Sequence, residues 1–382
     1  MKILIAPDKF KSSLNAREVA ENIAKGLRDV FLGATIDIVP MADGGEGTAE
    51  VICDALGGSW LKCKAHDPLG RAIEARYAWI ENSRLAVMEM SEAAGMRRLS
   101  ERERDPFLTN TFGVGEMILN AAQRSAREII IGLGGSATND GGFGMARSLG
   151  FQFFTGDEEL TGGVSELQRL TRIEAPVVAG VSPASSRSQS ARLPPQLKII
   201  AAVDVRNPLL GENGATRVFG PQKGATADKV EILERALTKL ADVVSKEFRV
   251  DYRDEAGAGA AGGLGFALMS FCGAKIRPGF DVVAEAVGLK SKMRSVDVVI
   301  TGEGSLDRQT LEGKTPVGVA RLARRLGKQV FAIVGRASGD QEVRELFDKV
   351  YQLAQSGMSE KEQMSRAAEL LRENARELAK IL

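Results

Sequence analysis

The sequence predicts an α/β fold with two domains. Three observations support this prediction: the length of the chain, the strand–helix–strand order at both of its ends, and a change of pattern in its middle. At 382 residues the chain is longer than one hydrophobic core usually organises, so about two domains are expected. Alternating apolar and polar residues begin near residue 59, and the strand–helix order returns over about the last hundred residues. We therefore expect one domain at 1–60 with 285–382 and a second at 61–284.

The first 47 residues predict a parallel strand–helix–strand unit. Residues 2–6 form a short apolar run that is typical of a buried strand, and residues 36–40 form a second. Asn15 and Glu18 have the spacing of a capping box, which predicts the start of the helix between the strands. A parallel crossover places the loops that follow both strands at one edge of the sheet. Open α/β sheets bind their ligands at that edge.

The middle of the chain predicts a mixed sheet. Runs of alternating apolar residues at 61–65, 73–79 and 85–90 are typical of an antiparallel meander. A helix near 114–126 and a strand at 128–133 then follow, as in a parallel unit. This combination indicates a type of domain different from the first.

The remaining segments continue the α/β pattern. An apolar run at 197–203 predicts another strand, and Thr226 is placed to cap a long amphipathic helix. The Ser- and Pro-rich residues 182–195 predict an exposed loop that is dispensable for activity. Further strands are expected at 296–301, 329–334 and 349–353, with a helix that starts at Thr315 and Pro316.

Composition excludes several classes of protein. The net charge of +1 gives no field that would attract nucleic acid or a membrane surface. The 3 cysteines form no CxxC pair, so we expect a cytoplasmic protein without disulfides. There is no run of about 18 apolar residues for a membrane helix, and the apolar run at the N-terminus is too short for a signal peptide. His66 is the only histidine, which excludes two-histidine metal sites and favours a turn residue over a catalytic triad.

A glycine-rich segment at 134–142 is the strongest local signal of function. It reads GGSATNDGG and lies between a predicted strand and a predicted helix. Such a turn presents backbone N–H groups at a helix start, where anions bind. Ser136, Thr138 and Asn139 add hydroxyl and amide groups at the same place. The alternative is a tight turn that needs glycine only for steric reasons.

Two other segments resemble nucleotide-binding motifs but fail their requirements. Residues 257–262 match GxGxxG, yet no strand is predicted before them, as a dinucleotide fingerprint requires. Residues 313–315 match the end of a P-loop, but Arg308 stands where the first glycine should be. Lys314 can still contact a phosphate as a point charge, and Lys223 precedes a helix in a similar loop.

Four aspartates each follow a predicted strand within a few residues: Asp8, Asp43, Asp204 and Asp307. Any one of them alone is typical of an exposed loop or a helix cap. Together with glycine loops and lysines at the same edge of parallel sheets, they supply carboxylates for Mg²⁺ and for a general base, and N–H groups for phosphates. These are the groups that phosphoryl transfer requires.

Eight motifs follow one another in order along nearly the whole chain: MKILIAPDKFKSSLNAREVA, MADGGEGTAE, TNTFGVGE, IIIGLGGSATNDGG, FGPQKGAT, GAGAAGGLG, VVITGEGSLD and TLEGKTPVGVA. Together they resemble the bacterial glycerate kinase family, which phosphorylates D-glycerate with ATP. The resemblance lapses at about 172–196, where this chain carries a longer Ser/Pro/Arg-rich stretch than expected.

The resemblance implies a two-domain α/β enzyme with its site in a cleft between the domains. One domain would be flavodoxin-like, with a parallel sheet built from both chain ends, and the other would be inserted, with a mixed sheet. The family uses ATP with Mg²⁺ and a three-carbon hydroxy acid, and its usual product is 2-phosphoglycerate, less often 3-phosphoglycerate. A monomer or a homodimer is expected.

The roles within this site are our own inference from the residues. Asp204 is the expected general base because it ends a buried strand, and Asp8 and Lys11 complete the catalytic set. Asp8 and Asp43 are the expected Mg²⁺ ligands. Substrate binding is assigned to Asp43, Ser136 and Arg277, with Lys11 and Arg277 placed for the substrate carboxylate. Nucleotide binding is assigned to Gly134, Gly135, Lys223, Gly302, Glu303, Gly304 and Lys314.

Two other functions compete with this hypothesis. A nucleotide-dependent oxidoreductase of a small hydroxy acid would need a dinucleotide fingerprint after a strand, and the one GxGxxG lacks it. A non-catalytic glycerate sensor would need a module that binds DNA or protein, and no basic helix or extra domain is predicted. Turnover with ATP or with NAD(P)H separates these alternatives.

Overall fold

The computed structural model describes residues 1–176, 193–308, 314–354 and 357–382. The chain divides into two compact units, one formed by 1–56 with 278–382 and the other by 57–277. The sequence places these boundaries near residues 60 and 285. Residues 177–192, which include most of the Ser- and Pro-rich segment, lie outside the described residues, as do residues 309–313, which include the first four residues of the TLEGKTPVGVA motif.

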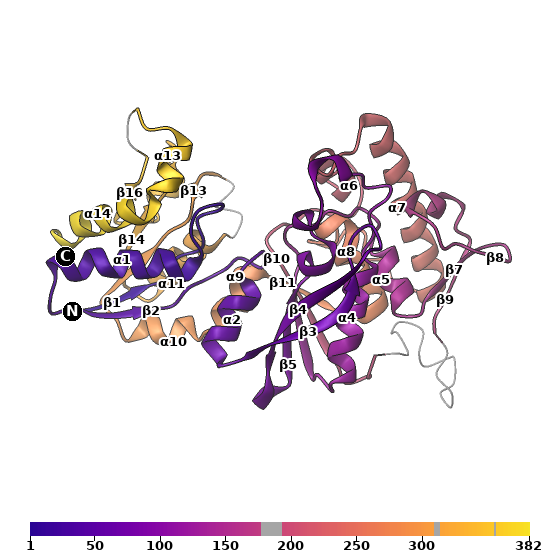
Figure 1. Ribbon diagram of the computed structural model, residues 1–382, viewed down its shortest axis with the longest axis horizontal. Helices are drawn as coiled ribbons and strands as arrows, with labels where there is room; N and C mark the ends of the chain where they lie inside the picture. Colours follow the sequence, from indigo (N-terminus) through magenta and orange to yellow (C-terminus); the bar gives the residue numbers. More distant parts are fainter. Residues whose placement is uncertain (177–192, 309–313, 355–356) are drawn as a thin grey trace. The chain divides into compact units, whose positions relative to one another are not determined.

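The first unit contains a five-stranded parallel sheet (Figure 1). Its strands are β1 (Lys2–Ile5), β2 (Thr35–Ile38), β12 (Val298–Thr301), β14 (Gln329–Val334) and β16 (Lys349–Gln352). They lie in the order β16-β14-β12-β1-β2, which in chain order is the flavodoxin-like arrangement. The predicted parallel sheet built from both ends of the chain is therefore confirmed.

Eight helices and a short strand pair accompany this sheet among the described residues. The helices are α1 (Ala16–Val30), α2 (Thr48–Leu56), α9 (Gly279–Ala286), α10 (Leu289–Arg294), α11 (Thr315–Arg325), α12 (Gln341–Arg344), α13 (Glu360–Ser365) and α14 (Ala367–Ala379). The short pair is β13 (Ser305–Leu306) with β15 (Arg336–Ala337).

Helix α1 shows how local sequence and packing combine. The predicted capping box is present: the Asn15 side chain accepts from the Glu18 N–H, and the Glu18 carboxylate accepts from the Asn15 N–H, both at 2.8 Å. The buried face of α1 includes Val19, Ile23 and Leu27. Gly26 lets α14 approach closely, because a Cβ there would lie 2.3 Å from the Arg372 carbonyl oxygen. The two helices lie side by side in Figure 1.

The second unit contains a six-stranded mixed sheet in the order β11-β10-β6-β5-β4-β3. The predicted meander is confirmed, since β3 pairs with β4 and β4 with β5 in antiparallel fashion, whereas β5, β6 and β10 are parallel. The bounds are β3 (Ser59–His66), β4 (Ala72–Ile80), β5 (Leu85–Glu89), β6 (Glu128–Gly132), β10 (Lys198–Val203) and β11 (Lys275–Pro278).

The helices of this unit and a small sheet surround its core. The helices are α3 (Ser91–Ala94), α4 (Phe112–Gln123), α5 (Phe143–Ser148), α6 (Ala215–Phe219), α7 (Ala227–Phe248) and α8 (Ala260–Cys272); the small sheet is β7 (Gln152–Thr155), β8 (Glu158–Glu159) and β9 (Arg172–Glu174). Edge-to-face phenylalanine contacts, such as Phe143 with Phe153 at 4.7 Å between ring centroids, tie α5, β7 and α8 together.

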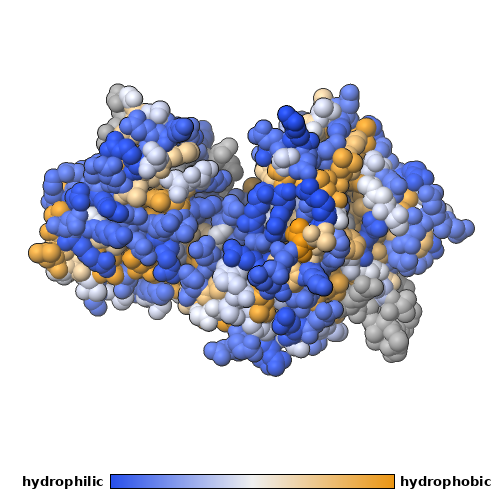
Figure 2. All heavy atoms as spheres, in the orientation of Figure 1, coloured by the Kyte–Doolittle hydropathy of each residue, from blue (hydrophilic) through white to orange (hydrophobic). Residues whose placement is uncertain are grey.

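The surface is mainly polar on the face drawn in Figure 2, where apolar side chains form small separate groups. Leu32 is the most exposed of the large apolar residues described, with 93% of its surface accessible. None of the helices in the described ranges has the length and apolar character needed to cross a bilayer.

Helix α8 begins with three residues in left-handed conformation, Ala261, Gly262 and Gly263. This turn packs directly on the 134–142 loop: Gly262 accepts from the Gly141 N–H at 2.9 Å, and a Cβ on Gly262 would lie 2.1 Å from the Thr138 carbonyl oxygen. Within the described residues no strand leads into 257–262. The GxGxxG match therefore serves close backbone packing rather than dinucleotide binding.

We expect Gly262→Ala to destabilise the protein far more than Gly327→Ala. Both glycines have φ of +68°, but nothing lies within 4 Å of a Cβ at Gly327. Gly327→Ala should thus cost only the left-handed strain of about 1–2 kcal/mol, and Gly262→Ala should add the clash with Thr138. Urea unfolding of both variants measures the difference. Equal losses of stability would contradict the close packing of α8 on the loop.

Candidate functional site

The predicted site residues form two groups in the structure, one in each unit. In the first unit, the group lies where the order of the parallel strands reverses. The chain passes from β1 to β2 on one side and later returns to β12 on the other side of β1. Loops at the carboxyl ends of β1 and β12 therefore diverge at a topological switch point, the usual ligand site of such sheets. Asp8 and Gly302 meet there, since the Asp8 N–H donates to the Gly302 carbonyl at 2.8 Å.

Asp8 is a buried carboxylate with 6% of its surface exposed. One of its oxygens accepts from the Thr315 hydroxyl at 2.6 Å, and the other accepts from the Lys9 N–H at 2.7 Å. Burial, reinforced by the nearby charge of Asp43, raises the pKa of Asp8 to about 6. A cation bound next to the two carboxylates would relieve both effects.

Asp43 lies in the loop after β2, and that loop is held against the Asp8 loop. The Met41 N–H donates to the Pro7 carbonyl at 2.9 Å, and the Asp43 carboxylate accepts from the Gly45 N–H at 3.1 Å. A Cβ on Gly279 would lie 1.8 Å from the Asp43 carbonyl oxygen, so the start of α9 fixes the loop from the other side. The structure therefore brings together the two aspartates that the sequence predicts as Mg²⁺ ligands.

The residues described in the structure contain no group of three or more His, Cys, Asp or Glu side chains that could hold a metal ion. Asp8 and Asp43 are thus a two-carboxylate set. This number fits Mg²⁺ that is also coordinated by water and substrate phosphates, which is the way Mg²⁺ is usually held in phosphoryl-transfer enzymes.

The segment 302–304 passes close to Lys11. A Cβ on Gly304 would lie 3.6 Å from the Lys11 backbone nitrogen, and a Cβ on Gly302 would lie 2.2 Å from the Ile333 carbonyl oxygen. The Gly335 N–H donates to the Glu303 carbonyl at 3.0 Å, which fixes this segment to the end of β14. The Lys11 side chain is exposed, and Lys314 precedes the first residue of α11.

A cavity of about 190 Å³ opens beside Asp8 in the same unit. Pockets that enclose a whole drug-sized ligand measure about 300–1,000 Å³, so this one can take only part of a ligand. Its lining combines charged side chains of both signs with apolar ones. The charged residues are Asp8, Lys9, Arg17, Glu46, Glu50, Asp54 and Lys292, and the apolar residues include Val39, Pro40, Met41, Val51, Ala55 and Val287.

In the second unit, the group lies at the carboxyl ends of β6 and β10. Gly134 and Gly135 follow β6, and Gly135 has φ of +73°, a conformation that favours glycine. Gly135 is exposed and Gly134 half-buried, so their backbone is open to a ligand. Ser136 is buried, with its hydroxyl 3.2 Å from that of Thr138.

Asp204 follows the parallel neighbour β10 and is exposed. The Leu133 N–H donates to the Ala202 carbonyl at 3.1 Å, so the segments that lead to Gly134 and Asp204 are in register. Arg277 is half-buried in β11, the strand next to β10. The structure thus places three predicted site residues, Ser136, Asp204 and Arg277, on one sheet.

Lys223 has a different environment from the open loop that the sequence suggests. It ends a short 3-10 helix at Pro221–Lys223 and has only 3% of its surface exposed. Its ammonium donates to the Thr138 carbonyl at 2.6 Å, beneath the 134–142 loop.

Asp307, the last of the four predicted aspartates, follows β13 in the first unit. It therefore belongs to a different unit from Ser136 and Lys223.

The segment 109–116, TNTFGVGE, anchors the glycine-rich loop. The Thr109 hydroxyl donates to the Ala137 carbonyl at 3.0 Å. Thr111 donates from both its N–H and its hydroxyl to the Asp140 carboxylate, at 2.9 and 2.8 Å. Asp140 also accepts from the N–H groups of Gly142 and Gly144. Although these hydrogen bonds favour its charged form, burial raises the pKa of Asp140.

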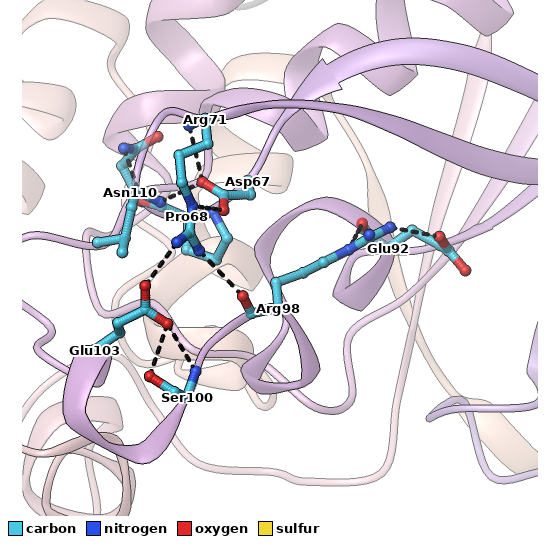
Figure 3. A network of polar contacts seen from close by, with 9 residues as sticks. Asp67, Pro68, Arg71, Glu92, Arg98, Ser100, Glu103 and Asn110 are labelled. Atoms are coloured by element: carbon cyan, nitrogen blue, oxygen red, sulfur yellow. Dashed lines mark hydrogen bonds and ion pairs between the residues drawn. The ribbon is translucent and has the colours of Figure 1, made fainter.

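A polar network supports this segment in turn (Figure 3). Arg71 bridges the Asp67 and Glu103 carboxylates and donates to the Arg98 carbonyl. The Asn110 N–H donates to the Pro68 carbonyl at 2.9 Å. His66, next in the chain to Asp67, pairs with Glu116 at 2.9 Å through Nδ1. The single histidine is thus the last residue of β3, directly before the turn in which the sequence places it.

Comparison with known proteins decides the family. The glycerate kinase family model matches residues 3–382.

The chain belongs to the glycerate kinase family.

Its relatives span nearly the whole molecule. Glycerate kinase from Bacillus subtilis strain 168 is 40% identical over 382 residues, covering 99% of this chain and 97% of its own. Glycerate 2-kinase from Escherichia coli K12 is 42% identical over 344 residues, covering 89% of this chain and 86% of its own. A crystal structure from Salmonella typhimurium LT2, assigned as a glycerate kinase 2, has a TM-score of 0.84 at 39% identity and covers 100% of this chain and 98% of its own.

These findings confirm the predicted family and the two α/β domains, and they make the protein a kinase. Phosphoryl transfer from ATP is the reaction class of the family, and glycerate is its small-molecule substrate.

The sequence alone does not single out three residues that hold the predicted site loops. Thr315 donates to Asp8, and Thr111 donates to Asp140 of the glycine-rich loop. In the sequence, Thr315 indicates only a helix start, and Asp140 is only one residue of a glycine-rich motif. The pattern of Thr-x-Thr in 109–111 was a usable signal, because paired hydroxyls next to a helix start often bond to backbone or carboxylate.

Replacing Asp8 by Asn should stabilise this glycerate kinase at neutral pH. Because the pKa of Asp8 rises from 3.8 to about 6 on folding, the folded state retains a proton that the unfolded state has lost. The carboxyl group therefore costs stability as pH rises from about 4 through 6. The stability of Asp8→Asn relative to wild type should rise by up to about 3 kcal/mol between pH 4 and pH 8.

Urea unfolding across this pH range measures the effect. Asp54→Asn, which removes an exposed carboxylate from the same unit, controls for the loss of an acidic group. A stability difference between wild type and Asp8→Asn that does not change with pH would contradict proton retention by Asp8.

Proposed function

We propose that the protein transfers the γ-phosphoryl group of ATP to the 2-hydroxyl of D-glycerate, giving 2-phosphoglycerate and ADP. The observation that carries this proposal is the pair Asp8 and Asp43 at the switch point of a flavodoxin-like sheet, in a chain of the glycerate kinase family. The choice of the 2-hydroxyl is supported by the relative from Escherichia coli, which is named glycerate 2-kinase.

The proposed roles are divided between the two units. Asp8 and Asp43 would hold Mg²⁺, which neutralises charge on the phosphates when it is bound. The glycine backbones at 134–135 and 302–304 would donate N–H groups to phosphate oxygens, with Glu303 and Lys314 beside them. Arg277 would bind the substrate carboxylate with two parallel hydrogen bonds, and Ser136 of the same unit would orient the substrate. Lys11 would add a positive charge to the loop that carries Asp8.

Asp204 is the proposed general base. It takes the proton of the 2-hydroxyl while the hydroxyl oxygen bonds to the γ-phosphorus and the bond from that phosphorus to the β-phosphate oxygen breaks. Its exposure at the end of β10 leaves the carboxylate accessible to a small substrate. The parallel pairing of β10 with β6 fixes the position of the backbone that precedes Asp204.

The reaction itself is tested by phosphorus NMR of the product. We expect ATP and D-glycerate with Mg²⁺ to give the phosphomonoester of the 2-hydroxyl. Incubation with NAD(P)H and D-glycerate or its oxidised form serves as the control for an oxidoreductase and should show no change in nicotinamide absorbance. A phosphomonoester at the 3-position would overturn the regiochemistry, and nicotinamide turnover would overturn the function.

Replacing Asp204 by Asn should lower kcat by about 10²–10⁴-fold with little change in the KM values, because the shape is kept and the proton acceptor is lost. Glu212→Gln is a matched control, since Glu212 lies in the same loop and its side chain is 92% exposed. Steady-state kinetics of both variants provide the measurement. Near-normal kcat in Asp204→Asn would exclude this residue as the base.

A further inference from the structure

Lys223 is a buried cation whose position is fixed from both sides. The Lys223 N–H donates to the Gly220 carbonyl at 3.0 Å. The next residue, Gly224, has φ of +96°, and a Cβ there would lie 2.2 Å from the Arg104 carbonyl oxygen. The backbone of Lys223 is therefore held against the 104 segment, and its side chain reaches under the 134–142 loop to the Thr138 carbonyl. The Lys223 ammonium is thus bound to the underside of the loop, with only 3% of the residue exposed.

Thr138 connects this ammonium to the open part of the loop. The Ser136 hydroxyl lies 3.3 Å from the same Thr138 carbonyl that accepts from Lys223, and the Thr138 N–H donates back to the Ser136 hydroxyl at 3.2 Å. Ser136 follows the exposed Gly135 directly. The hydrogen bonds of Thr138 thus connect the Lys223 ammonium to a serine directly beside the exposed Gly135.

We propose that Lys223 is a positioning residue: by holding the Thr138 carbonyl, its ammonium keeps the N–H groups of Gly134–Ser136 oriented to receive an anion, and loss of its proton loosens that hold. This role rests on the proposed function only for the identity of the anion, which is a phosphate or carboxylate of a substrate. The assignment replaces direct phosphate contact as the role of this lysine.

The charge of Lys223 is poised to change near neutral pH. Burial lowers the pKa of Lys223 to about 7, although the Asp140 carboxylate on the same loop acts in the opposite direction. The segment packed against Gly224 contributes Arg104, a second charge on the elements around Lys223. An anion bound to the loop favours the charged ammonium, so anion binding should be accompanied by proton uptake above about pH 7.

Stability and ligand affinity should therefore respond to pH in opposite directions. Between about pH 7 and 10.5 the unfolded state carries a proton on Lys223 that the folded state has lost, so the contribution of this group to stability rises with pH. Over the same range the hold on Thr138 weakens and anion affinity falls. A side chain that serves only to fill space would produce neither dependence.

The test uses Lys223→Gln and Lys223→Met in the full-length protein. Gln can still donate to Thr138 but carries no titrating charge, so its anion affinity should not change between pH 6.5 and 8.5, whereas that of wild type should fall. The Met side chain has no hydrogen-bond donor. Lys223→Met should therefore lower kcat/KM about 10- to 100-fold at pH 6.5, which is the effect expected when one charge-assisted hydrogen bond is lost. The matched control is Lys229→Gln. Lys229 lies in the first turn of α7 and forms an ion pair with Asp105.

Calorimetric titration of inorganic sulfate, an anion that does not titrate near neutral pH, measures the proton uptake directly at pH 8 in buffers of different ionisation enthalpy. Uptake in wild type and in Lys229→Gln, but not in Lys223→Gln, supports the proposal. Equal uptake in Lys223→Gln, or wild-type kcat/KM in Lys223→Met, overturns it. Because the sulfate titration needs no turnover, absence of D-glycerate phosphorylation by wild type would refute the proposed function without affecting this result.

Discussion

The pairing of β1 with β12 is the constraint on which the first unit depends. It joins residues from opposite ends of the chain: the Lys2 N–H donates to the Asp297 carboxylate at 2.8 Å across 295 positions, and the Thr301 hydroxyl donates to the Ala6 carbonyl at 2.8 Å. Once β12 lies beside β1 on the side away from β2, the strand order must reverse there. Asp8 owes its buried place to that reversal, since it follows β1 at the point where the loops diverge.

An insertion of more than two hundred residues between the strands β2 and β12 does not prevent this pairing, because the entropy of closing a loop grows only slowly with its length. The inserted unit also has its own hydrophobic core, centred on β6, α5 and α8. Each unit therefore supplies its own stability, and its ligand-facing loops are built on a rigid sheet rather than on a long unsupported segment.

Close backbone contact accounts for several of the 42 glycines of this chain. Gly262 lies against the Thr138 carbonyl, Gly279 against Asp43, and Gly302 against the end of β14. At each of these positions a Cβ would lie within 2.2 Å of a backbone oxygen. The Gly262 and Gly302 contacts thus hold the loops that we assign to anion binding against other parts of the backbone. Two buried charges, Asp8 and Lys223, lie directly behind these loops, and burial disfavours the charged form of each.

The sequence by itself determined the α/β class, the antiparallel meander, the capping box of α1 and the family, because these depend on local periodicity, on cap chemistry and on motifs that can be read in order. It also indicated Asp8 and Asp43 as partners, since both follow strands of one parallel crossover. Only the tertiary structure decided that Lys223 lies under the glycine-rich loop, that Thr315 donates to Asp8, and that residues 257–263 pack on Thr138. Each of these contacts joins residues that are 80 or more positions apart, and their geometry follows from how helices and loops pack on the sheet rather than from any local pattern.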